Sequence, residues 1–244
     1  MQGNGYSWEE TEPYETNAYR PPGMPLILLT IYYFFGVSVP HAILLQVLIA
    51  TGAVFMTYVV TARLFGPGVG VVAAIFQGLD PLSISYSNLL LTEVYSSGIL
   101  ICCAFFVMKY SETGNKWFLW AISLILGAGI LIHPILLFLP IIILVLPLLC
   151  SKTRRWRPVL SAGLVTIIAL TPAGFWVVRN IKVADYAGIS CVTAVNLMKY
   201  KAAGVMADLN GTDLLSEAKK LRDELIEFFH RPHRVFMKES VRSR

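Results

Sequence analysis

The stretch that decides the fold covers residues 79–93 and reads LDPLSISYSNLLLTE. It lies between two apolar segments, yet it contains two carboxylates, an Asp-Pro step and a run of hydroxyl side chains. Ionisable side chains are costly in lipid and usually mark a functional site. Irregular backbone at that depth occurs only where it is buried in protein or lines a wet cavity. The stretch is therefore predicted to interrupt a membrane span and to line an active-site cavity at a membrane face.

Composition excludes a soluble domain. Hydrophobic residues make up 56% of the 244 residues, charged residues only 14%, and the mean hydropathy is +0.64. The net charge of +5 comes from basic residues between apolar runs, which is a topology signal and not a nucleic-acid surface. The four cysteines have no metal-ligand or redox spacing and are interpreted as apolar filler.

The apolar runs predict an all-α polytopic membrane protein with about six transmembrane helices. The run over 117–149 is too long for one ordinary crossing, so His133-Pro134 is interpreted as a turn between two spans. With that turn, all three basic loops fall on one side, which is the cytoplasm by the positive-inside rule. The predicted spans cover 41–62, 69–79, 89–108, two segments within 117–149, and 159–178.

Three regions follow from this topology. Residues 1–40 are predicted to be extracytoplasmic, and Met24–Phe35 within them is too short to span and reads as a helix in the membrane interface. Residues 41–180 form the transmembrane bundle. Residues 181–244 form an extracytoplasmic tail, in which 213–229 has the spacing of an amphipathic helix. The protein is expected to be a multi-pass integral protein of the cell membrane, plasma or inner.

Glu93 and Asp80 are the candidate catalytic carboxylates. Glu93 stands at the edge of a span, where acids are rare enough to favour a function over an interfacial acid facing water. Asp80 precedes Pro81, so it either takes part in the chemistry or caps a helix.

Four other residues are candidates for substrate binding. Arg20 offers a cation at head-group height, which suits a phosphate, although it could also be an interfacial anchor. Tyr86 and Asn88 could orient a polar head group or could satisfy the backbone of a broken helix. His133 is either a ligand-binding residue or a packed residue of the turn. The sequence predicts no metal ligands.

Four motifs occur in the order seen in the GT-C membrane glycosyltransferases. They are RPPGMPL at 20–26, ARLFG at 62–66, YSN at 86–88 with LTE at 91–93, and WVVRN at 176–180. The chain resembles this superfamily, most closely its protein-mannosyltransferase and aminoarabinose-transferase group. The resemblance implies transfer of a sugar from a polyprenyl-phosphate carrier to an extracytoplasmic acceptor. It also implies that Arg20 lies near the carrier phosphate and Glu93 beside the active site. His133 differs from the arginine that the group has before this proline.

The family begins with a spanning helix and an acidic motif that supplies the catalytic base, and neither precedes Gln2. The chain is therefore expected to be an internal or N-terminally truncated piece of a longer enzyme. The implied partners are membrane lipid and a lipid-linked sugar donor, and a cation or a divalent metal would stabilise the departing phosphate. The alternative is a transporter or a non-catalytic membrane subunit, because broken helices are typical of transporters too.

Overall fold

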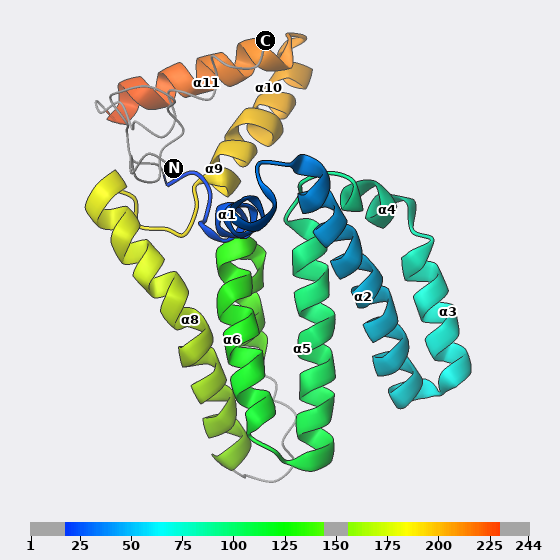
Figure 1. The fold of residues 1–244 in the computed structure, drawn as a ribbon. Coiled ribbons are helices and arrows are strands. Elements are labelled where there is room, and N and C mark those ends of the chain that lie inside the picture. The colour runs from blue at the N-terminus through cyan, green and yellow to red at the C-terminus, as the bar shows by residue number, and fades with distance from the viewer. Residues whose placement is uncertain (1–17, 144–155, 230–244) are drawn as a thin grey trace. The chain divides into compact units, whose positions relative to one another are not determined.

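The computed structural model describes residues 18–143 and 156–229, in which every regular element is a helix (Figure 1). The predicted all-α fold is confirmed. These residues form two compact units, 21–175 and 18–20 with 176–229. The helices are α1 (Gly23–Phe35), α2 (Val39–Phe65), α3 (Pro67–Gly78), α4 (Pro81–Ser87), α5 (Glu93–Thr113), α6 (Trp117–Ile132), η1 (Pro134–Leu137), α8 (Trp156–Ala184), α9 (Val192–Asn196), η2 (Leu197–Ala202), α10 (Ala203–Asn210) and α11 (Leu214–Phe229).

Three described helices are long and apolar enough to cross a membrane, namely α2, α5 and the part of α8 from Val159 to Ala184. A fourth crossing is formed if α3 and α4, which are bent by 57° at the break between them, count as one span. α6 and the helix over Pro134–Ile143 are apolar but shorter. The protein is thus a membrane protein. Each predicted span contains a described helix, although residues 144–149 of the second segment within 117–149 lie outside the described residues. The number of six crossings stays a prediction.

The helices present their apolar side chains outward. Only 17% of the most apolar window of α2 is buried, and Phe55 and Phe76 are 61% and 76% exposed. Such surfaces suit lipid, where close packing between helices relies on small residues. Gly70 of α3 packs on Ala62 of α2, where a Cβ atom on the glycine would lie 2.7 Å from the alanine Cβ. Cys103 of α5 is buried in a core with Ile122, Leu126, Val165 and Ala169.

The breaks between helices fall where proline and glycine predict them. α3 ends at Gly78 and α4 begins at Pro81, while α6 ends at Ile132, directly before His133-Pro134. Several boundaries differ from the predicted ones: α8 covers Trp156–Ala184 and not 159–178, and α5 covers Glu93–Thr113 and not 89–108. Residues 88–92 instead form a turn, in which the Leu91 amide donates to the Leu89 carbonyl at 2.7 Å. The predicted amphipathic helix at 213–229 is confirmed as α11.

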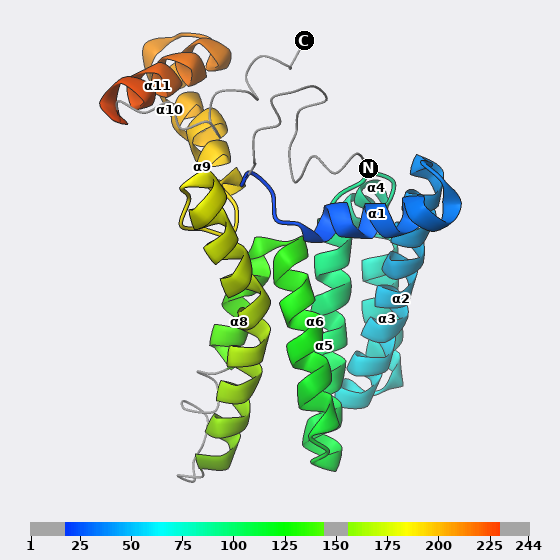
Figure 2. The ribbon, with the colours of Figure 1, turned by 60° about the vertical axis from the view of Figure 1, so that its left-hand side comes forward.

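The first compact unit has two distinct ends. Arg63, near the end of α2, pairs with Glu112 near the end of α5 at 3.2 Å, so the loops 63–66 and 109–116 lie at the same end. Glu93 and the α3–α4 break lie at the opposite end (Figure 1). There α1 lies across the end of α6, and a Cβ atom on Gly23 would be 2.5 Å from the Leu131 carbonyl oxygen (Figure 2). This crosswise helix matches the predicted interfacial helix, and its depth in a membrane stays a prediction.

Candidate functional site

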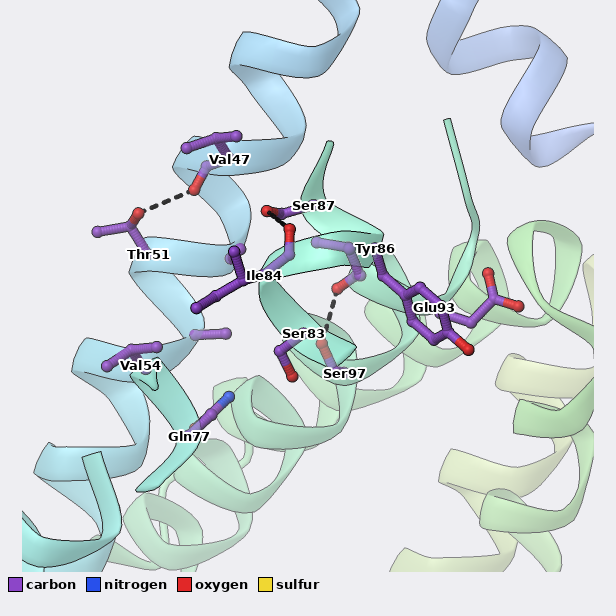
Figure 3. A pocket seen from close by; sticks show the side chains of 14 residues that line it. Val47, Thr51, Val54, Gln77, Ser83, Ile84, Tyr86, Ser87, Glu93 and Ser97 are labelled. Atoms are coloured by element: carbon purple, nitrogen blue, oxygen red, sulfur yellow. Dashed lines mark hydrogen bonds between the residues drawn. The ribbon is translucent and has the colours of Figure 1, made fainter. Parts of the chain in front are cut away.

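A pocket of about 480 Å³ opens between α2, α3, α4 and the start of α5 (Figure 3). Its volume is in the range usual for small-molecule sites. Two of the predicted site residues, Tyr86 and Glu93, line it together. The other lining residues mix apolar and polar side chains: Val47, Ala50, Thr51, Ala53, Val54, Gln77, Gly78, Ser83, Ile84, Ser87, Val94 and Ser97.

Glu93 is the acidic group of this pocket. It is the first residue of α5, where the positive end of the helix dipole stabilises an anionic side chain. Its carboxylate is exposed and accepts one long hydrogen bond, from the Thr92 hydroxyl at 3.4 Å. Among the described residues it has no ion-pair partner. The carboxylate is therefore available to a ligand in the pocket.

Most hydroxyl groups around the pocket donate their hydrogen within their own helix. Ser87 donates to the Ile84 carbonyl at 2.7 Å and Ser97 to the Val94 carbonyl at 2.9 Å (Figure 3). Ser83 donates to the Asp80 carboxylate at 2.6 Å, and Thr51 donates to the carbonyl of Val47 at 2.9 Å.

Besides Glu93, two polar side chains of the pocket have hydrogen-bonding groups that are not used by other described residues. The Tyr86 hydroxyl and the Gln77 amide make no hydrogen bond to another described residue, and both line the pocket. Gln77 is not among the site residues predicted from the sequence. Its signal was an amide one residue before the end of an otherwise apolar helix. Polar side chains in spans are conspicuous because lipid offers them no partner.

Asp80, Asn88 and His133 do not line the pocket, and each has a local partner. The Asp80 carboxylate accepts from the Ser83 backbone amide at 2.8 Å and so caps α4. The Asn88 amide donates to the Ile84 carbonyl at 2.9 Å, at the end of the same helix. His133 Nδ1 accepts from the Ile135 amide at 3.4 Å, at the start of η1. These contacts fit the structural alternatives weighed for the three residues.

Gln46 of α2, also missed in the sequence, holds the residues that precede Glu93. Its side chain is fully buried. Its Nε2 donates to the Tyr86 carbonyl at 2.7 Å, to the Ser87 carbonyl at 3.4 Å and to the Leu89 carbonyl. The Leu89 carbonyl is therefore bonded to a side chain of α2, and Leu89 is not part of helix α5. This explains why α5 begins later than the apolar run predicts.

Arg20 lies in the second compact unit and is exposed. The preceding Tyr19 is buried against Cys191 and Val195, and its carbonyl accepts from the Ser190 hydroxyl at 2.6 Å. The Arg20 guanidinium carbon is 5.9 Å from the centre of the Tyr19 ring. The chain is thus anchored immediately before Arg20.

The WVVRN motif holds this same segment. The Trp176 indole donates to the Ile189 carbonyl at 3.1 Å, and the buried Asn180 amide donates to the Gly188 carbonyl at 2.8 Å. The Arg179 guanidinium lies 4.8 Å from the Trp176 ring centre and donates to the Asn180 side chain at 3.0 Å. Arg179 therefore has the geometry of a structural anchor.

Residues 18–143 and 156–229 contain no group of three His, Cys, Asp or Glu side chains arranged to hold a metal ion. The N-terminal glutamates, which are further candidate carboxylates in the sequence, lie outside the described residues: Glu9, Glu10, Glu12 and Glu15.

The family model described as dolichyl-phosphate-mannose-protein mannosyltransferase matches residues 19–176, which include α1 to α6 and the whole pocket. No curated protein and no solved structure matches the chain. The family match confirms the resemblance to GT-C membrane glycosyltransferases. Because it covers well over half of the 244 residues, the chain belongs to the dolichyl-phosphate-mannose-protein mannosyltransferase family.

Proposed function

We propose that this chain transfers a sugar from a polyprenyl-phosphate carrier to an extracytoplasmic acceptor, and that the pocket between α2 and α5 holds the reacting sugar. The observation that carries the proposal is the exposed Glu93 carboxylate, which has no ion-pair partner among the described residues and lines a pocket within the family-matched region. A carboxylate at the mouth of a membrane helix bundle is costly unless it serves a function.

In this reaction an acceptor oxygen attacks the anomeric carbon, and the bond from that carbon to the phosphate oxygen breaks. Within this chain, Glu93 is the carboxylate of the pocket that can take the proton of the acceptor hydroxyl, whereas the resemblance gives the role of general base to a separate acidic motif. The phosphate departs with the electron pair. Tyr86 and Gln77 supply an uncommitted hydroxyl and amide for the hydroxyl groups of the sugar. Sites that hydrogen-bond a substrate hydroxyl discriminate strongly against analogues that lack it.

Arg20 is proposed to contact the carrier phosphate. A guanidinium binds phosphate in a bidentate manner and stays charged at any working pH. Its backbone is anchored on one side by buried Tyr19 and followed by Pro21-Pro22, which restrict the conformation of the chain. Little entropy is then lost when the side chain binds. Asp80, Asn88 and His133 are assigned supporting roles in this proposal, through the turns that they cap.

The proposal is tested with Glu93→Gln in membranes that carry the chain and a labelled polyprenyl-phosphate mannose. Loss of a general base is expected to lower the rate of sugar transfer by about 10²- to 10⁴-fold. Glu112→Gln is the matched control, because Glu112 lies on the same helix and pairs with Arg63 at 3.2 Å and Lys109 at 3.0 Å. Transfer by the control variant should stay near that of the unaltered chain.

A binding measurement accompanies the rate measurement. A photoactivatable analogue of the lipid-linked sugar should label peptides from residues 77–97 in the unaltered chain and in Glu93→Gln. Labelling elsewhere only, or equal transfer by Glu93→Gln and the unaltered chain, would refute the assignment of the pocket. Accumulation of the intact sugar lipid across the membrane, without transfer, would support the transporter alternative.

A further inference from the structure

The Gln46 side chain connects two parts of the bundle that are far apart in the sequence. Its amide nitrogen reaches Tyr86 and Leu89, which lie 40 and 43 residues away. The orientation of the amide is fixed by its partners, because all three are carbonyl oxygens and only the nitrogen can donate to them. An amide in a lipid-embedded helix is unfavourable unless it is hydrogen-bonded. These bonds satisfy the nitrogen of the fully buried Gln46 side chain, whereas its Oε1 has no hydrogen-bond partner among the described residues.

Gln46 adds a donor to three carbonyls, of which those of Tyr86 and Leu89 also accept from the Leu89 amide at 3.3 Å and the Leu91 amide at 2.7 Å. α4 ends at Ser87, and the last carbonyls of a helix have no partner within the helix. In water such groups are hydrated, but in a membrane bundle they must be satisfied by protein. Gln46 serves the carbonyls of Tyr86 and Ser87 and that of Leu89 in the following turn. The turn over 88–92 is thus held from α2.

We infer that Gln46 is a positioning residue for the pocket: it acts through the backbone of the α4–α5 turn and holds Tyr86 and Glu93 in place. Tyr86 is fixed directly, because its own carbonyl is an acceptor of the amide. Glu93 follows four residues after Leu89 and begins the next helix. Gln46 itself does not line the pocket. The inference concerns the shape of the site and holds whichever substrate the site takes.

The test is amide hydrogen exchange on the full chain in lipid nanodiscs. The reporters are the amides of Asn88, Leu89 and Leu91, which donate to the carbonyls of Ser85, Tyr86 and Leu89. Gln46→Leu replaces the amide by an apolar side chain of similar size and so removes the donor. The backbone amides of the turn should then exchange at least about tenfold faster. Ser123→Ala is the matched control. Ser123 is equally buried but donates only to the Leu119 carbonyl of its own helix.

Gln46→Glu is a second variant, in which hydrogen-bond donation depends on the protonation of the new carboxyl group. A protonated carboxyl group can donate one hydrogen bond, and an ionised one can donate none. Protection of the turn in Gln46→Glu should therefore lie between the unaltered chain and Gln46→Leu. After correction for intrinsic exchange, it should decrease as the pH rises.

The outcomes separate this inference from the proposed function. Unchanged protection of the turn in Gln46→Leu would overturn it, as would faster exchange spread evenly over α2 and α5. If Gln46→Leu does not insert into membranes, protection in Gln46→Glu that does not depend on pH overturns it as well. Because exchange is measured without substrate, the result stands even if no sugar transfer is found. If transfer is found, Gln46→Leu should lower kcat, and Ser123→Ala should not.

Discussion

Substitution of Gly23 by alanine is expected to loosen α1 from α6. A Cβ atom at this position would lie 2.5 Å from the Leu131 carbonyl oxygen and 2.6 Å from both the Ile132 amide nitrogen and Cγ1. Two of these three atoms are backbone, so rotation of a side chain cannot make room. Helix α1 must then move away, and overpacking of this kind typically costs about 1–3 kcal/mol. The variant should unfold at a lower mole fraction of SDS in mixed micelles.

The matched control is Gly52→Ala in α2. An added Cβ atom there has no neighbour within 4 Å. Alanine is favoured over glycine inside a helix by roughly 0.5–1 kcal/mol, so this variant should be equally stable or more stable. The same chemical change is thus expected to act with opposite sign at the two positions. If Gly23→Ala is as stable as Gly52→Ala, the close contact between α1 and α6 is refuted.

Two further predictions concern charged groups. Arg20→Ala should lower sugar transfer per inserted molecule at least about tenfold, a loss of roughly 1.4 kcal/mol of transition-state stabilisation, and Arg20→Lys should keep part of the activity; undiminished transfer would exclude phosphate binding. The hydrogen bond from Lys220 at 2.8 Å, and then that from Thr212 at 2.8 Å, hold the pKa of Glu217 below its ordinary value of 4.5. The stabilisation of the α10–α11 pair is therefore present above the ordinary pKa and lost as the pH falls through the lowered one. Helicity of this pair should fall on acidification below about pH 4.5, and less steeply in Glu217→Gln; equal slopes would contradict this role.

Local chemistry made the helix breaks predictable. Proline lacks the backbone donor that a helix interior needs, so Pro81 and Pro134 mark breaks that the sequence alone indicates. The start of α5 was predicted four residues too early. The apolar run from Leu89 is suited to a helix, and the contact that prevents it comes from Gln46, more than 40 residues earlier. Hydrophobic periodicity carries no information about such a tertiary contact.

Prediction of the site was limited in the same way. Glu93 and Tyr86 could be identified because a carboxylate and a hydroxyl run interrupt apolar segments, and both line the pocket. The type of a polar residue does not tell whether its side chain forms a hydrogen bond within its own helix or faces a pocket. Asp80 and Asn88 are bonded locally, whereas Gln77, in an ordinary apolar helix, faces the pocket.

The family motifs can now be separated by what their polar groups bind. In WVVRN, Trp176 and Asn180 hold the backbone of residues 188–189, and in ARLFG, Arg63 pairs with Glu112. The hydrogen bonds and the ion pair of these motif residues stabilise the fold, and this role explains their presence without any substrate. Glu93 differs, because it has no ion-pair partner among residues 18–143 and 156–229 and yet lines a pocket. Acids in or near membrane spans are rare and usually mark a functional site, so Glu93 stays the predicted catalytic residue. Tests of chemistry therefore belong first at Glu93, whereas the polar residues of WVVRN and ARLFG are better tested by stability.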